Sequence, residues 1–206
     1  NAFIYFLKLI KEQNMYCLLR PGPYVMSELK NEGLPNWIFE NYPEIRAVDR
    51  NGQKHNSKTV SYNHPVFLNN VSKWYKKICG IISEYLITSG GPVILFQLDN
   101  EVGMMNWITN NPDLNDFTVN EFIKYLQNTE NKSFTKDEII TAMKSENKNS
   151  LYIQNSYMEF MRFYYKNYFL FLKNEAEKNS INVPFVVNVH GFTNLDYAKR
   201  GKEYPI

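Results

Sequence analysis

The chain has 206 residues, enough for one domain with a substantial core, and its composition excludes several classes of protein. A formal net charge of +2, with lysines and acids interspersed, excludes the basic surface of a nucleic-acid-binding domain. No apolar run approaches the roughly 18 residues of a membrane-spanning helix, so we predict no nucleic-acid or membrane partner. No signal peptide is visible, and the compartment stays open, with a cytoplasmic location slightly favoured over secretion.

The first half of the chain alternates helical patterns with short apolar runs that are typical of strands. Prolines and glycines mark the ends of these segments, because neither residue continues a helix or a central strand well. The predicted elements are a helix over 2–13, a buried strand over 15–19, a long loop over 21–64 with one helical turn near 35–39, a helix from Pro65 through Tyr85 and a buried strand over 93–98.

The second half adds three helices and a third strand. Thr135 and Glu138 have the spacing of a capping box and predict that a helix begins there. The predicted elements are a helix over 118–128, a helix from Thr135 through Lys144, a long helix over 151–178 and a buried strand over 184–189. This alternation predicts an α/β fold with parallel strands and long loops after each strand. An open, doubly wound sheet and part of a (β/α)₈ barrel both fit this pattern.

Polar residues follow each predicted strand, and parallel strands place such residues at one edge of a sheet. They are Arg20, Tyr24 and Glu28 after the first strand, Asn100 and Glu101 after the second, and Asn188 and His190 after the third. Glu101 is the best candidate for a general acid, because it follows a buried strand directly. The amide of Asn100 can hold a ligand hydroxyl, and aromatic rings in the loops expected to overhang the site, such as Trp37, suit the C–H faces of a sugar.

Each of these residues also has a simpler interpretation. Arg20 is as well suited to a structural ion pair as to a ligand contact, and Glu28 to a surface loop. Trp37 could belong to the core and His190 to an ordinary loop. No His, Cys or carboxylate set has the spacing of metal ligands, and no glycine-rich phosphate loop is present, so no metal or cofactor is predicted.

Two segments resemble the signatures of one enzyme family. Residues 18–28, LLRPGPYVMSE, followed by GLPNW at 33–37, resemble the third-strand signature of glycoside hydrolase family 35 β-galactosidases. Residues 90–103, GGPVILFQLDNEVG, are similar to the fourth-strand block of the same family. Residues 43–65 also resemble the related family 42 enzymes. The two main blocks have the same order as in the family and together are far more specific than an isolated Asn-Glu pair.

The resemblance implies part of a (β/α)₈ TIM barrel and a retaining β-galactosidase mechanism. It places Glu101 as the acid/base, Asn100 as its sugar-binding neighbour, and Glu28 and Tyr24 in the motif that contacts substrate hydroxyls. The family nucleophile follows the seventh strand. The whole of 1–206 is expected to run from the second helix to just past the fifth strand, so we expect that nucleophile to lie outside the chain.

Two further expectations follow from a partial barrel. The isolated chain is expected to be inactive, and its open strand edges favour self-association. Four residues depart from the family pattern near the expected pocket and weaken galactose as the assigned sugar: Leu29, Glu32, Asp99 and Val102. The alternative function is a carbohydrate-binding module, derived from a barrel, that has no catalytic activity.

Overall fold

The computed structural model describes residues 2–188 except 27, 57, 105, 107, 108, 110 and 146. The chain forms two compact units. Within this described part of the chain, the first unit consists of 2–34, Asn69–Glu101 and 169–188. Among the described residues, the second consists of Pro35–Leu68 and Val102–Tyr168. The long helices α3 (Pro65–Ile82) and α7 (Leu151–Lys178) each contribute residues to both units.

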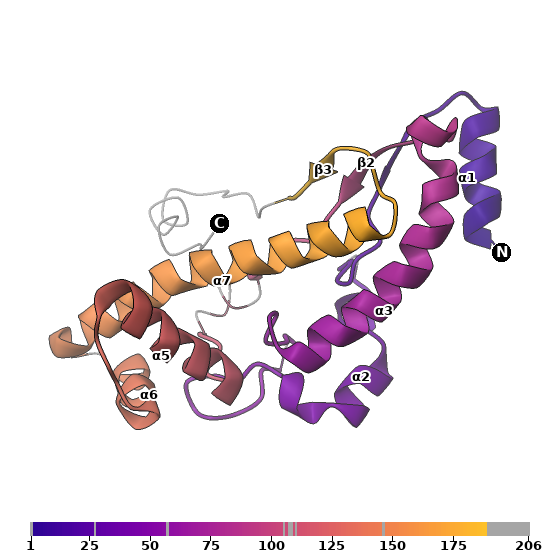
Figure 1. Ribbon diagram of the computed structural model, residues 1–206. Helices are drawn as coiled ribbons and strands as arrows, with labels where there is room; N and C mark the ends of the chain where they lie inside the picture. Colours follow the sequence, from indigo (N-terminus) through magenta and orange to yellow (C-terminus); the bar gives the residue numbers. More distant parts are fainter. Residues whose placement is uncertain are drawn as a thin grey trace, which may run out of the picture. The chain divides into compact units, whose positions relative to one another are not determined.

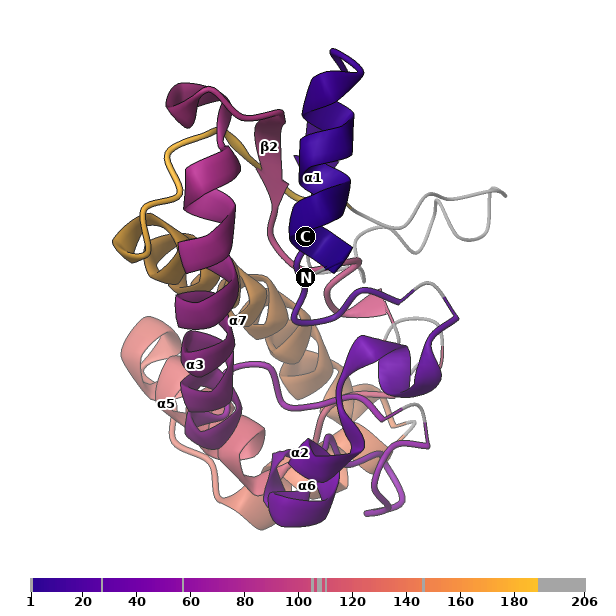
Figure 2. The same cartoon turned by 90° about the vertical axis from the view of Figure 1, so that its right-hand side faces the viewer.

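A parallel sheet forms the centre of the first unit. Its strands β1 (Cys17–Leu19), β2 (Val93–Gln97) and β3 (Phe185–Val186) lie in the order β1-β2-β3. This order confirms the predicted parallel α/β arrangement. Figures 1 and 2 show β2 beside the C-terminal part of α3. There the ring of Phe96 packs edge-on against Tyr75 of α3, with 6.1 Å between ring centroids, and against Phe185 of β3, with 5.8 Å.

The two outer strands are shorter and less buried than the sequence predicts. Val93 and Phe96 of the central strand are fully buried, as expected. In contrast, Leu18 of β1 is 45% exposed, and Met15 and Tyr16 before it are also exposed. The prediction of a buried strand over 15–19 is therefore wrong for this part of the chain. Among the described residues β1 is an edge strand that pairs only with β2, and edge strands are less enclosed than the central strand.

Helices and short 3₁₀ turns complete the first unit. Helix α1 (Ala2–Glu12) buries Leu7. The turn η1 (Lys30–Gly33) lies in the loop after β1, and η3 (Ser83–Tyr85) and η4 (Ile87–Ser89) lead from α3 to β2. Gly91, in the connection to β2, lies so close to the Tyr85 carbonyl that a Cβ there would be 2.0 Å from its oxygen.

The second unit is helical. Its elements are α2 (Asn36–Asn41), η2 (Pro43–Ile45), α5 (Asp116–Glu130), α6 (Lys136–Lys144), η5 (Lys148–Ser150) and the first part of α7. Helices α5 and α6 pack against α7 (Figure 1), and Phe122 of α5 lies 5.2 Å from Phe160 of α7 between ring centroids. The predicted capping box is confirmed, since Thr135 and Glu138 each bond the other's backbone N–H.

Within the described residues, no helix combines the length and apolar character needed to cross a membrane. That part of the chain also contains no group of three His, Cys, Asp or Glu side chains placed to hold a metal ion.

Candidate active site

The C-terminal ends of the first two strands are joined by a hydrogen bond between side chains. Nη1 of Arg20, which follows β1, donates to Oδ1 of Asn100, which follows β2, over 3.2 Å. The sequence prediction that these strand ends meet is therefore correct. Among the described residues Arg20 forms no ion pair, so its alternative interpretation as a structural ion-pair partner finds no support here.

Three amide side chains extend this contact to the end of β3. Nε2 of Gln97 donates to Oδ1 of Asn188 over 2.8 Å, to Oδ1 of Asn100 over 3.4 Å and to the backbone oxygen of Asp99 over 2.9 Å. Nδ2 of Asn188 donates to Oδ1 of Asn100 over 3.1 Å. Gln97 and Asn100 are buried, so these bonds form where water competes little. We call Arg20, Gln97, Asn100 and Asn188 the strand-end network.

The amide orientations in the strand-end network follow from two groups that can only donate. A guanidinium has no acceptor, so Arg20 requires the oxygen of Asn100 on its side. The backbone N–H of Glu101 likewise requires the oxygen of Asn188, which it reaches over 3.1 Å. Because Oδ1 of Asn100 already accepts three bonds, the other end of this amide, Nδ2, faces away from them. No partner for this nitrogen occurs in the described chain, and it can therefore donate to a ligand hydroxyl.

Glu101 follows this network in a tightly held turn. Its backbone φ is +46°, and that of Asp99 is +59°, values that are unusual for residues other than glycine. Two side chains hold the turn: the fully buried Asp99 accepts from the backbone N–H of Asn100 over 2.5 Å, and Asn188 accepts from that of Glu101. The side chain of Glu101 is half-buried. Such backbone strain persists where the surroundings fix it, which is common at functional sites.

The loop after β1 carries two more of the predicted site residues. Its start is fixed by α3, because Trp74 and Tyr75 donate to the carbonyls of Pro21 and Gly22, each over 2.9 Å. Burial raises the pKa of the Tyr75 phenol well above its usual value, so this hydroxyl stays a donor. Further along the loop, Tyr24 is buried, at 2% exposed, whereas Glu28 is exposed with φ +54°.

The other predicted site residues lie elsewhere. In the part of the chain that the structure describes, Glu28 makes no hydrogen bond or ion pair, so its ligand-binding role stays a prediction. Trp37 belongs to α2 of the second unit, where it is 46% exposed. His190 lies outside the described residues, as does Trp107.

Sequence reasoning missed the roles of two residues. The sequence predicts Gln97 only as part of the apolar run that forms β2, and it places Asn188 among the strand-end residues without indicating its partner. A polar amide within an otherwise apolar strand was the available signal for Gln97, since a buried amide needs partners. For Asn188 the sequence contains no comparable signal, because its contact with Glu101 joins residues 87 positions apart.

Comparison with known proteins gives a consistent picture. Residues 1–193 match the model for glycosyl hydrolases family 35. A β-1,2-glucosyltransferase from Ignavibacterium album is 30% identical over 206 residues, covering 92% of this chain and 28% of that protein. An exo-β-D-glucosaminidase from Thermococcus kodakarensis is 38% identical over 99 residues, covering 47% of this chain and 13% of that protein.

Solved structures share the fold. The crystal structure of a β-galactosidase from Bacillus circulans sp. alkalophilus superimposes with a TM-score of 0.71 at 18% sequence identity. The match covers 100% of this chain and 31% of that chain. A β-galactosidase from the psychrophilic Marinomonas ef1 gives a TM-score of 0.66 at 12% identity, covering 98% of this chain and 37% of that chain. The chain therefore spans about a third or less of these relatives and neighbours.

Proposed function

Because the chain belongs to glycosyl hydrolases family 35, we propose that the protein containing it is a retaining glycosidase that releases a terminal β-linked sugar, galactose or a similar one. In this proposal, the three parallel strands are part of a (β/α)₈ barrel. The observation that carries the proposal is the strand-end network, which joins the ends of all three strands and holds the turn that bears Glu101.

Glu101 acts as the acid/base in this mechanism. Its carboxyl gives a proton to the glycosidic oxygen as the bond from that oxygen to the anomeric carbon breaks. A second carboxylate, outside this chain, attacks the anomeric carbon and forms a glycosyl-enzyme. Glu101, now a carboxylate, takes a proton from water, whose oxygen displaces the enzyme from the sugar with net retention. Two inversions at one carbon give this retention.

The substrate-binding residues would act around this step. The amide Nδ2 of Asn100 donates to a sugar hydroxyl, and Arg20 holds Asn100 in the orientation that makes this possible. Glu28 accepts from further hydroxyls, and the remaining contacts are assigned to Tyr24, Trp37 and His190. The substrate is a carbohydrate, and none of these steps uses a metal or cofactor.

A second candidate function is transfer of the sugar to another sugar. It is favoured by the relative that aligns over 92% of this chain, which is a β-1,2-glucosyltransferase. The chemistry differs only in the second step, where Glu101 takes the proton from an acceptor hydroxyl instead of from water. Mass spectrometry of products formed from an aryl β-glycoside, with and without a free glucose acceptor, separates the two functions. Disaccharide products indicate transfer, and free sugar alone indicates hydrolysis.

The hydrolase proposal is tested by Glu101→Gln in the full-length protein. Loss of the proton donor should lower kcat for a β-disaccharide by about 10²- to 10⁴-fold. For a dinitrophenyl glycoside, whose leaving group needs no proton, the rate of the first step, formation of the glycosyl-enzyme, should fall much less. If the wild-type full-length protein binds the sugar but cleaves neither substrate, the non-catalytic carbohydrate-binding alternative is correct instead.

A further inference from the structure

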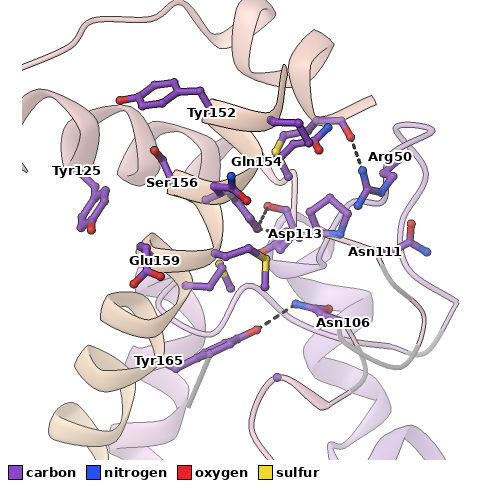
Figure 3. Close-up of a pocket in the computed structure, with 18 of the residues that line it drawn as sticks. Arg50, Asn106, Asn111, Asp113, Tyr125, Tyr152, Gln154, Ser156, Glu159 and Tyr165 are labelled. Carbon is purple, nitrogen blue, oxygen red and sulfur yellow. Dashed lines mark hydrogen bonds between the residues drawn. The ribbon is translucent and has the colours of Figure 1, made fainter. Parts of the chain in front are cut away.

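A cavity of about 930 Å³ lies in the second unit. It is formed by the loop that carries Arg50, by residues 103, 106 and 111–113, and by α5, α6 and α7 (Figure 3). Its volume is within the range of small-molecule binding sites. None of its lining residues belongs to the strand-end network or to the residues given a role above.

Several polar side chains in this cavity lack a partner within the described chain. Ser156 is 8% exposed and Asn155 is exposed, and neither side chain forms a hydrogen bond there. Nδ2 of Asn106 donates to the hydroxyl of Tyr165 over 3.3 Å, whereas its buried Oδ1 has no partner. The side-chain amide of Asn111 likewise has no hydrogen-bond partner among the described residues. A buried polar group without a partner destabilises the fold, so Ser156 and Oδ1 of Asn106 point to a ligand that forms hydrogen bonds. Asn111 and Asn155 are more accessible and offer further donors and acceptors beside them.

The charged groups of the cavity each have a hydrogen-bond or ion-pair partner within the chain, and Glu130 accepts from the hydroxyl of Tyr152. Arg50 donates to the backbone oxygen of Met143 (Figure 3), and Glu159 pairs with Arg162 over 2.7 Å. Both carboxylate oxygens of Asp113 accept hydrogen bonds, one from a threonine hydroxyl over 2.6 Å and the other from backbone N–H groups. The described lining residues thus include one cation, Arg50, against the carboxyl groups of Asp113, Glu130 and Glu159. This excess of acidic groups disfavours an anionic ligand and is compatible with a neutral one.

Aromatic rings add an apolar surface to this polar lining. Tyr125 and Tyr152 both line the cavity (Figure 3), and Tyr152 is 37% exposed. Aromatic rings next to side-chain amides and hydroxyls that have hydrogen-bonding capacity to spare suit a molecule with C–H faces and many hydroxyl groups. We propose that this cavity binds a neutral saccharide, with Asn106, Asn111, Asn155 and Ser156 as its hydrogen-bond partners.

Methionine methyl NMR of the full-length protein can test this proposal. Met143, Met158 and Met161 line the cavity, whereas Met26 lies in the first unit, in the loop that carries Glu28. The probes are the neutral disaccharides lactose and sophorose and the anionic digalacturonate, added to the Glu101→Gln variant so that turnover is slow. We expect a neutral disaccharide to shift the three cavity methyls and digalacturonate to leave them unchanged.

Two variants identify the partners. Asn155→Ala and Ser156→Ala each remove one hydrogen bond and should weaken saccharide binding at the cavity methyls by about 3- to 10-fold. Asn167→Ala is the matched control, because Asn167 lies exposed on the same helix and does not line the cavity, and it should leave the affinity unchanged.

The proposal is overturned if only Met26 responds, if no methyl responds, or if digalacturonate shifts the cavity methyls as strongly as the neutral sugars. It is also overturned if Asn155→Ala and Ser156→Ala both bind like the wild type. None of these outcomes depends on catalysis, whereas failure of the glycosidase proposal would appear only in the turnover of substrates by the wild-type protein.

Discussion

Oδ1 of Asn188 accepts a hydrogen bond from the backbone N–H of Glu101, with 3.1 Å between the two atoms. This contact joins the end of β3 to the end of β2 across 87 residues of sequence. It acts on the backbone of Glu101, whose φ of +46° is strained. Asn188 thus helps to fix the direction in which the Glu101 carboxyl leaves the sheet.

The first prediction is that Asn188→Ala lowers activity through geometry. Without the acceptor the turn can relax, and misplacement of a catalytic carboxyl by about 1 Å can cost up to about 10²-fold in rate. We expect a fall in kcat of about 10- to 100-fold in the full-length protein, measured by steady-state kinetics on an aryl β-glycoside. Val187→Ala, at an exposed neighbouring position, is the control and should stay near wild type. Equal losses in both variants would contradict the positioning role.

Arg20 gives a second prediction, because it contacts Asn100 and not Glu101. Arg20→Lys keeps the charge but loses the planar donor that reaches Oδ1 of Asn100 over 3.2 Å. The Asn100 amide then loses one of the three bonds that orient its oxygen, while those from Gln97 and Asn188 remain. The looser orientation weakens the binding of substrate more than the chemical step. KM should rise by about 3- to 10-fold with kcat within about twofold of wild type.

The control for Arg20 is Lys30→Arg, a reverse exchange at an exposed position of η1 in the following loop. It should leave both constants unchanged. If Arg20→Lys lowers kcat and leaves KM unchanged, Arg20 acts in the chemical step and not in substrate binding.

Local patterns predicted much of this fold. The apolar run before Asn100 predicted the central strand, and the spacing of Thr135 and Glu138 predicted the start of α6, because each signal lies within a few residues. The motif around Glu101 also placed the candidate acid at a strand end. Such features can be predicted because the residues that determine each of them lie close together in the sequence.

Long-range features could not be predicted in the same way. The contact between Gln97 and Asn188 depends on the pairing of β2 with β3, which the sequence of neither strand specifies alone. The exposure of Leu18 depends on what covers β1, and local apolarity contains no information about that cover. The contact roles of Glu28, Trp37 and His190 and the expected self-association stay predictions.

The third prediction compares two glycines and concerns stability. A Cβ at Gly91 would lie 2.0 Å from the carbonyl oxygen of Tyr85, so Gly91→Ala must displace the backbone before β2. We expect it to lower the free energy of unfolding by about 3 kcal/mol or more. Gly80→Ala is the matched change in α3, where a Cβ meets nothing within 4 Å, and should raise stability by about 0.5–1 kcal/mol. Urea denaturation measures both, and similar values for the two variants would disprove the close approach at Gly91.

The fourth prediction concerns pH and the start of α3. Nδ1 of His64 accepts a hydrogen bond from the backbone N–H of Val66 over 3.3 Å, which requires this nitrogen to be unprotonated. Burial lowers the pKa of His64, although Glu44 and Asp113 act in the opposite direction. The folded state therefore binds a proton less readily than the unfolded state, where the pKa is about 6.5.

The sign of the pH effect follows from this difference. The contribution of His64 to stability is fully present above the unfolded pKa of about 6.5 and is lost as the pH falls from there through the lower folded value. Hydrogen exchange of the Val66 amide should accelerate, relative to its intrinsic rate, between about pH 7 and pH 5. His64→Asn keeps an acceptor at the same position but does not titrate, so its Val66 protection should stay flat over this range. Parallel profiles for the wild type and His64→Asn would show that His64 does not control the start of the helix.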